Sequence, residues 1–209
     1  LQQTRVEAVK GYYRRFLEVL PDIKALAEAP ENLLLKLWEG LGYYSRVRNL
    51  QKAAKVIIEE HGGVFPSEYK SILALPGIGE YTAGAIGSIC FDIPEPAVDG
   101  NVLRIISRIT ETYSDVLAPS TKKNVADALR SVYPSGELAY TFNQSMMELG
   151  ATVCVPNGAP KCEICPVKQI CMAHKNNSWD LLPQKEPKKK RKIEEKTVFV
   201  LRCREKTAV

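Results

Sequence analysis

The sequence predicts an all-α protein whose helices form two lobes with a groove between them. Apolar residues recur at spacings of three and four along most of the 209 residues, which is the period of a helix with one buried face. Glycine and proline divide these stretches into segments of ordinary helix length. No strand pattern of weight appears before residue 197. Helices packed on helices are the simplest way to bury such stripes.

The helix boundaries follow from residues that start and stop helices. Pro21-Asp22 ends the first predicted helix and caps the second. Gly62-Gly63 ends the longest helix, and Ser120 is predicted to cap a later one. The predicted helices span residues 1–20, 23–29, 30–39, 47–61, 67–75, 82–89, 102–109, 120–132 and 137–153.

The chain is expected to hold one helical domain over residues 1–183, a linker over 184–196 and the start of a truncated second domain over 197–209. The residues from Asp180 to Val209 carry ten Lys/Arg against five Asp/Glu, which accounts for the whole net charge of +5. A solvated connector explains this basic run better than a tail that grips nucleic acid. The segment TVFVLRC (197–203) has strand character but no apparent partner.

Composition limits the environment of the chain. There is no run of eighteen apolar residues and no basic-then-apolar leader, so we expect a soluble, cytoplasmic protein of bacterial type with no membrane partner. Six cysteines in such a chain argue against a disulfide framework. Residues 1–179 are formally neutral, so a nucleic-acid site in the body must come from local placement of basic groups.

The sequence Leu75-Pro76-Gly77-Ile78-Gly79 predicts a tight turn between two helices, because both glycines permit unusual backbone angles. The next helix starts at this turn. Its unpaired amides and the positive end of its dipole would suit an anion such as a phosphate. From the glycines alone, a plain helix–helix turn is the simpler explanation.

Asp99 has two interpretations. An aspartate in front of an apolar helix is usually an N-cap, and by itself this explanation is the stronger one. The alternative is a carboxylate that faces a cleft beside the Gly77–Gly79 turn, where it would stabilise a developing cation.

Four of the six cysteines lie within eighteen residues, as Cys154-x7-Cys162-x2-Cys165-x5-Cys171. Four thiolates on one loop suit either tetrahedral zinc or a 4Fe–4S cluster. Structural zinc usually draws on two Cys-x2-Cys pairs. Only one such pair is present, so the spacing favours the cluster over zinc.

Six blocks of the sequence, in order, are similar to the MutY-type adenine DNA glycosylases of the helix-hairpin-helix superfamily, relatives of endonuclease III. The resemblance runs from Leu1 to about residue 183. It implies base excision repair by an enzyme that flips adenine, mispaired with 8-oxoguanine or guanine, out of double-stranded DNA and hydrolyses its N-glycosidic bond. Nothing demands a protein partner or more than a monomer on DNA. The blocks are LQQTRV, GLGYYSRVRNL, LPGIGEYTAGAI, AVDGNVLR, FNQSMMELGA and the four-cysteine loop (154–171).

The resemblance also implies roles for the matching residues. Asp99 would stabilise an oxocarbenium-like sugar, and Tyr81 and Asn101 would support the acid–base network. Leu1 and Gln144 would belong to the adenine pocket. Cys154, Cys162, Cys165 and Cys171 would hold a 4Fe–4S cluster, with zinc as the alternative. The residues expected at the DNA are Gln3, Thr4, Leu41, Tyr43, Arg46, Gly77, Gly79, Thr82 and Lys161.

Tyr81 separates two classes within the superfamily. Lyase-competent members such as endonuclease III carry a lysine at this position and form a Schiff base with it. A tyrosine cannot form one, so the sequence predicts a glycosylase without strand cleavage. The alternatives are an endonuclease III-like glycosylase/lyase and a non-enzymatic DNA-binding module with a structural metal.

The chain departs from the family pattern in three places. The family glutamate that protonates the leaving adenine lies three residues before the LQQT block, and hence before Leu1, so we expect this chain alone to be poorly active. The first cysteine gap is one residue longer than is usual in the family, which leaves the shape of residues 155–161 open. The domain that reads 8-oxoguanine would begin near Thr197.

Overall fold

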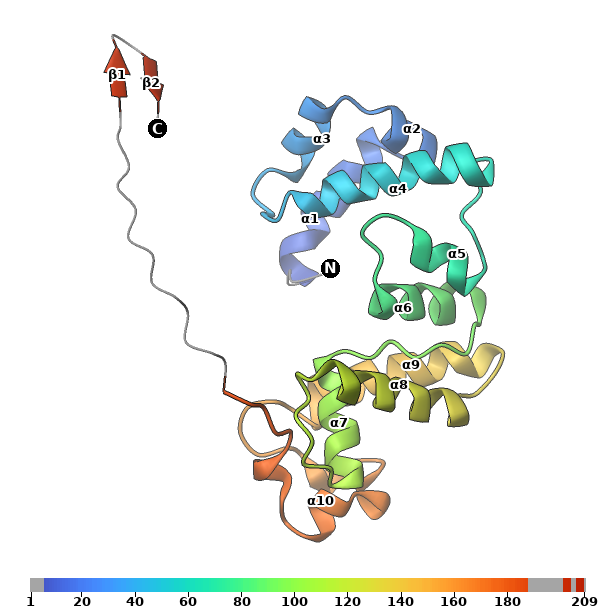
Figure 1. Ribbon diagram of the computed structural model, residues 1–209, viewed down its shortest axis with the longest axis vertical. Coiled ribbons are helices and arrows are strands. Elements are labelled where there is room, and N and C mark those ends of the chain that lie inside the picture. Colours follow the sequence, from blue (N-terminus) through green and yellow to red (C-terminus); the bar gives the residue numbers. More distant parts are fainter. Residues whose placement is uncertain (1–5, 188–200, 204–205, 209) are drawn as a thin grey trace.

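The computed structural model describes residues 6–187, 201–203 and 206–208 (Figure 1). Residues 6–187 contain helices and connecting segments but no strand, as the all-α prediction requires. Strand β1 (Leu201–Cys203) pairs antiparallel with β2 (Lys206–Ala208). The expectation that the 197–203 segment lacks a partner is therefore wrong for its described part, because the chain turns back and pairs with itself.

The first four helices form one group. Helix α2 packs against α4, and α1 packs against α3. Leu20, Leu34 and Val47 make the buried core between them. Asp22 caps α2 as predicted, since its carboxylate accepts a hydrogen bond of 2.7 Å from the amide of Ala25. The helices are α1 (Val6–Val19), α2 (Ile23–Glu28), α3 (Glu31–Trp38) and α4 (Ser45–His61).

A tight hairpin joins α5 (Tyr69–Ala74) to α6 (Glu80–Phe91), and the two helices pack together. Gly77 sits in this hairpin with a φ of +80°, a left-handed angle that favours glycine. A Cβ at Gly77 would lie only 2.6 Å from the Cβ of Asn49. The glycine therefore permits the backbone angle of the turn, and it also lets the hairpin lie directly on α4.

The second group surrounds α7, with α8 and α9 on one side and the cysteine loop and α10 at its far end (Figure 1). Its core is a cluster of aliphatic side chains from α7, α8 and the segments before them, namely Val98, Val102, Leu103, Val116 and Leu129. The α-helices are α7 (Gly100–Thr110), α8 (Pro119–Val132), α9 (Glu137–Glu148) and α10 (Met172–Lys175). Between and after them lie a π-helical turn, η1 (Leu149–Val153), and three short 3-10 turns, η2 (Cys162–Ile164), η3 (Lys168–Ile170) and η4 (Trp179–Leu181).

Two sequence predictions in this group are wrong. Ser120 does not cap α8, because Ala118 is the N-cap and Pro119 occupies the first helical turn, where a proline loses no hydrogen bond. The helix predicted over 137–153 does not continue as an α-helix, because it widens into the π-helical turn η1 after Glu148.

The first group and the hairpin make one lobe, which meets the second group where α6 packs on α9. Asn143 of α9 is buried, and its Nδ2 donates a hydrogen bond of 2.7 Å to the hydroxyl of Ser88 on α6. The Ser88 hydroxyl in turn donates to the carbonyl of Gly84 at 2.8 Å. A buried amide paired in this way fixes how the groups sit against each other. None of the described helices is both long and apolar enough to cross a membrane.

Gly84 tests how tightly α6 packs on the segment that follows it. A Cβ at this position would lie 2.5 Å from the carbonyl oxygen of Pro96. Alanine is the better helix former by about 1 kcal/mol, yet we expect Gly84→Ala to lower the free energy of unfolding by about 1–3 kcal/mol because backbone must move. Urea unfolding measures this change.

Gly11→Ala is the matched control for Gly84→Ala. Gly11 also lies inside a helix, but a Cβ there would meet nothing within 4 Å. This variant should be at least as stable as the original protein. Equal effects of the two substitutions would contradict the close packing of α6 on Pro96.

Candidate active site and cysteine loop

Asp99 is the N-cap of α7 and holds its carboxylate in a network of hydrogen bonds. One carboxylate oxygen accepts from the backbone amides of Asn101 and Val102, at 2.8 and 2.9 Å. The other accepts from the Asn101 side-chain amide at 2.9 Å. Three hydrogen bonds thus hold the carboxylate in one orientation. The structural and the chemical interpretations of Asp99 are compatible, since the bonds that cap the helix also fix a partly exposed carboxylate.

Tyr81 lies in the first turn of α6 and is half-buried. Burial, and after it the negative charge of Asp99, raise the pKa of Tyr81 above its ordinary value. The phenol of Tyr81 on α6 thus lies within electrostatic range of the Asp99 carboxylate. Asn101, on α7, is hydrogen-bonded to the same carboxylate.

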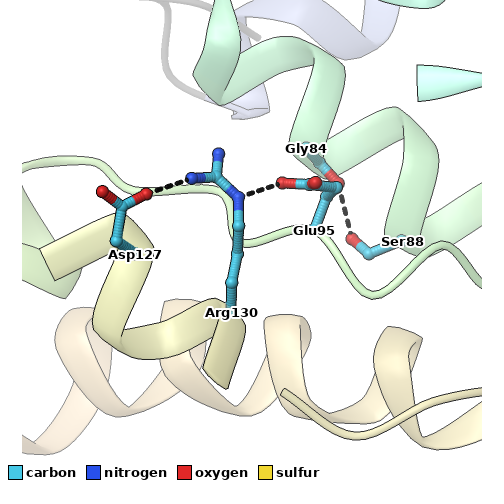
Figure 2. Close-up of polar contacts among 5 residues, drawn as sticks. All are labelled: Gly84, Ser88, Glu95, Asp127 and Arg130. Atoms are coloured by element: carbon cyan, nitrogen blue, oxygen red, sulfur yellow. Dashed lines mark hydrogen bonds and ion pairs between the residues drawn. The ribbon is translucent and has the colours of Figure 1, made fainter. Parts of the chain in front are cut away.

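The segment that leads into Asp99 is held from both sides. Figure 2 shows Arg130 of α8 between Asp127 and Glu95, and its Nε donates to the Glu95 carboxylate at 2.8 Å. On the other side, the backbone of Gly84 approaches the Pro96 carbonyl. The position of Asp99 thus depends on contacts from α6 and α8 as well as on its own helix.

Arg104 connects Asp99 to the cysteine loop. It is one turn beyond Asn101 on α7 and only 5% exposed. Its guanidinium donates to the side-chain oxygen of Asn101 at 3.0 Å and to the carbonyls of Gly150 and Cys154, both at 2.8 Å. A Cβ on Gly150 would lie 2.7 Å from the Cβ of Asn101, so the π-helical turn can approach α7 only because this residue is glycine.

The four predicted metal ligands border one cavity between α7, the π-helical turn and α10. Among the described residues, no three His, Cys, Asp or Glu side chains converge tightly enough for a single metal ion. Burial raises the pKa of the Cys162 and Cys165 thiols. Thiolates are therefore unfavourable there without a positive group to offset them. All four thiols nevertheless border the same space.

Arg108, one further turn along α7, supplies such a positive group. It is 5% exposed. Its guanidinium donates to the sulfur of Cys154 at 3.3 Å and to the carbonyls of Val155 and Leu182, at 3.1 and 3.0 Å. The loop that begins at Cys154 is thus tied to α7 by two buried arginines.

Three residues from the predicted adenine pocket and DNA contacts lie near the start of the chain, and the other predicted DNA contacts lie in the part that the structure describes. Leu1, Gln3 and Thr4 lie outside the described residues. Gly77 and Gly79 form the hairpin, Gly79 is the N-cap of α6, and half-buried Thr82 is in its first turn. Leu41, Tyr43 and Arg46 lie on the α3–α4 connection and the first turn of α4. Asn49, which touches Gly77, is one turn beyond Arg46, so these two predicted regions are neighbours.

The remaining predicted residues lie farther along the chain. Gln144 is half-buried on α9, directly after the buried Asn143. Lys161 is exposed at the start of the 3-10 turn that carries Cys162, and its amide donates to the carbonyl of Val153 at 3.0 Å. That contact closes the 155–161 segment, the part of the loop whose length departs from the family pattern.

Sequence reasoning missed the buried arginines. Arg104 and Arg108 stand four residues apart in VLRIISRI, on the helix face that also carries Asn101. Two arginines on one face of an otherwise apolar helix, with a cysteine loop downstream, were the available signal. The sequence gives no comparable signal for the Glu95–Arg130 ion pair, because the two residues are 35 positions apart.

Comparisons with known proteins show the family to which this chain belongs. A profile of the HhH-GPD superfamily of base excision DNA repair proteins matches residues 1–135. The adenine DNA glycosylase of Buchnera aphidicola subsp. Acyrthosiphon pisum (strain APS) is 38% identical over 192 residues, which cover 90% of this chain and 53% of that protein. The adenine DNA glycosylase of Mus musculus is 44% identical over 178 residues, covering 83% of this chain and 34% of that protein.

The fold has solved counterparts. A non-covalent endonuclease III–DNA complex matches with a TM-score of 0.70 and 25% identity, covering 84% of this chain and 80% of that chain. The chain thus matches most of a solved structure. It spans about half the length of the Buchnera relative and about a third of the mouse relative.

The proximity of Tyr81 to Asp99 can be tested by titration. Asp99→Asn removes the charge and keeps a good N-cap. It should lower the pKa of Tyr81 part of the way to its ordinary value, because burial, the larger cause, remains. Carbon-13 NMR of labelled tyrosine measures this, with Tyr81→Phe to assign the signal. An unchanged pKa in Asp99→Asn would contradict the geometry, and Asp22→Asn, the same change at another N-cap, should leave it unchanged.

Proposed function

Because the chain belongs to the HhH-GPD superfamily of base excision DNA repair proteins, we propose that it forms the catalytic domain of a monofunctional adenine DNA glycosylase. The reaction is hydrolysis of the N-glycosidic bond of an adenine mispaired with 8-oxoguanine or guanine in double-stranded DNA. The relatives named adenine DNA glycosylase support the substrate. No protein partner is needed for this reaction, and a monomer suffices.

The observation that carries the proposal is the fixed Asp99 carboxylate next to Tyr81. Loss of adenine leaves positive charge on the sugar, and a preorganised anion stabilises that charge without having to rearrange. The hydrogen bonds from Asn101 and Val102 hold the carboxylate oxygens in place. Tyr81, with its raised pKa, stays protonated at neutral pH and serves as a neutral hydrogen-bond donor.

Tyr81 also distinguishes hydrolysis from strand cleavage. A Schiff base requires an amine at the sugar, and a phenol cannot form one. The residue at this position therefore supports a glycosylase that forms no Schiff base with the sugar. Gln144 remains the proposed contact to the flipped adenine from this part of the chain.

The neighbouring hairpin and α3–α4 connection support DNA binding. The first hydrogen bond of α6 joins the amide of Ala83 to the carbonyl of Gly79 at 2.8 Å, so the amides of Gly79 to Tyr81 point out of the helix end. Such amides and the helix dipole suit a backbone phosphate. Tyr43, on the α3–α4 connection, is 65% exposed and offers a ring to stack on bases.

The cysteine loop fits a 4Fe–4S cluster better than zinc. Four thiols border one cavity. They include only one Cys-x2-Cys pair, whereas structural zinc usually draws on two such pairs, and four thiolates are the usual ligands of a 4Fe–4S cube. Cys154, Cys162, Cys165 and Cys171 would hold the cluster, which would fix the shape of the loop and take no part in bond cleavage. Lys161, exposed on the same loop, would then face DNA.

Asp99→Asn tests the proposed chemistry in the full-length protein. Single-turnover release of adenine from a duplex with adenine opposite 8-oxoguanine should fall by at least about a hundredfold, because the neutral amide cannot stabilise the sugar cation. Binding to the same duplex should change little, since asparagine preserves the cap of α7.

The matched control is again Asp22→Asn, which changes the cap of α2 in the same way. Adenine release by this variant should equal that of the original protein. If release survived in Asp99→Asn, the proposed role of Asp99 would be wrong.

The metal is tested by composition. The purified protein should contain iron and acid-labile sulfide in equal amounts and show the broad visible absorption of an iron–sulfur cluster. Cys162→Ser should lose both. Cys90→Ser, at an exposed thiol outside the loop, should keep both. Stoichiometric zinc in a colourless protein would rule out the cluster.

A further inference from the structure

The connection between α3 and α4 adopts an unusual backbone conformation. Gly40, Gly42 and Tyr43 all have left-handed φ angles, of 95°, 68° and 48°. For glycine this is ordinary, but a tyrosine rarely adopts it. Residues held in such conformations concentrate at functional sites, and the surrounding structure must enforce them. Tyr43 nevertheless lies on the surface, with 65% of its side chain exposed.

Arg46, in the first turn of α4, contacts this connection at several points. Its guanidinium lies 5.4 Å from the centre of the Trp38 ring and 5.5 Å from the centre of the Tyr43 ring. Both distances are typical of cation–π contacts. The guanidinium also donates to the carbonyls of Leu41 and Gly42, at 3.2 and 3.4 Å. It therefore contacts the backbone and the ring of the same short turn.

Trp38 completes the support from below. Its indole nitrogen donates to the Gly42 carbonyl at 3.0 Å, and its ring packs edge-on against Phe16 of α1. Trp38 thus anchors the turn in the core of the first group of helices. Arg46 contacts both the Trp38 ring and the Tyr43 ring.

We propose that Arg46 is a positioning residue that holds the Tyr43 ring ready to stack against a base in the DNA duplex. This inference rests on the proposed function. Stacking on a base is favoured when the ring is already ordered, because less conformational freedom is lost on binding. Arginine suits this role because its planar group stacks on a ring while its N–H groups bind carbonyls, which lysine cannot do.

The alternative role for Arg46 is a direct contact with a phosphate. The two roles predict different behaviour. A phosphate contact needs only the positive charge of the side chain. Loss of that contact reduces the slope of log affinity against log salt concentration by about 0.9. A positioning residue acts through Tyr43, so its loss matters only while Tyr43 is present and leaves the slope unchanged.

The test is equilibrium binding of the full-length protein, over a series of salt concentrations, to a duplex with adenine opposite 8-oxoguanine. A 2-aminopurine beside the mispair reports unstacking of the bases. We expect Arg46→Lys and Arg46→Met each to weaken binding about tenfold. Both variants should keep the original salt slope and give a smaller fluorescence change.

A double-mutant cycle separates the two roles. In a Tyr43→Ala background, Arg46→Lys should cause no further loss of affinity. Arg48→Met is the control: Arg48 is an exposed neighbour on α4 that pairs with Glu31 at 2.8 Å, and its loss should leave the fluorescence change intact.

Three results would overturn the proposal. The first is an Arg46→Lys variant that binds DNA as tightly as the original protein, and the second is a smaller salt slope in Arg46→Met. The third is a further loss of affinity when Arg46→Lys is added to Tyr43→Ala. If Arg46 variants unfold, the order parameter of the Tyr43 ring in folded, DNA-free protein still decides, since a mobile ring would contradict the proposal. An original protein that does not bind the duplex would instead refute the proposed function itself.

Discussion

The buried guanidinium of Arg104 is the interaction on which the arrangement of this site depends. It binds Asn101, which binds Asp99, and it binds the carbonyls of Gly150 and Cys154 on the opposite side. A buried charged group stabilises a fold only when all its donors are satisfied. The partners of Arg104 belong to three segments. The start of α7, the π-helical turn and the cysteine loop must therefore all be folded for the guanidinium to keep its hydrogen bonds.

The features that were predictable from the sequence are local ones. Asp22 and Asp99 cap helices, and Gly62 ends α4 in a left-handed conformation, because each of these depends on a few adjacent residues. The cap of α8 was misassigned within this same local reasoning: Pro119 begins the helix one residue before Ser120. The four-cysteine cluster was also visible, since its ligands are close in sequence.

The features that were not predictable are contacts between distant segments. Arg104 and Arg108 interrupt an apolar helix, and a pattern of that kind normally indicates an exposed polar face. They are instead among the most buried polar residues described. The sequence of α7 alone does not reveal their burial, because the carbonyls that satisfy them lie 46 to 74 residues away; the only available signal was the pair of arginines together with the cysteine loop downstream. The left-handed Tyr43 was not predicted either, although the contacts that Trp38 and Arg46 make with the α3–α4 connection are local in sequence, because a tyrosine rarely adopts this conformation.

The two buried arginines bear on what occupies the cysteine loop. They lie one turn apart, and burial lowers the pKa of Arg104 while Arg108 lowers it further; the charge of Cys154 opposes both. Two neighbouring cations in a low-dielectric interior repel each other unless anions offset them. Neutral thiols offer no such charge, whereas thiolates that bind metal do. In the proposed cluster, ligated cysteines would supply the negative charge that offsets Arg104 and Arg108. The cluster would then also stabilise the arginine that holds Asn101 and, through it, Asp99.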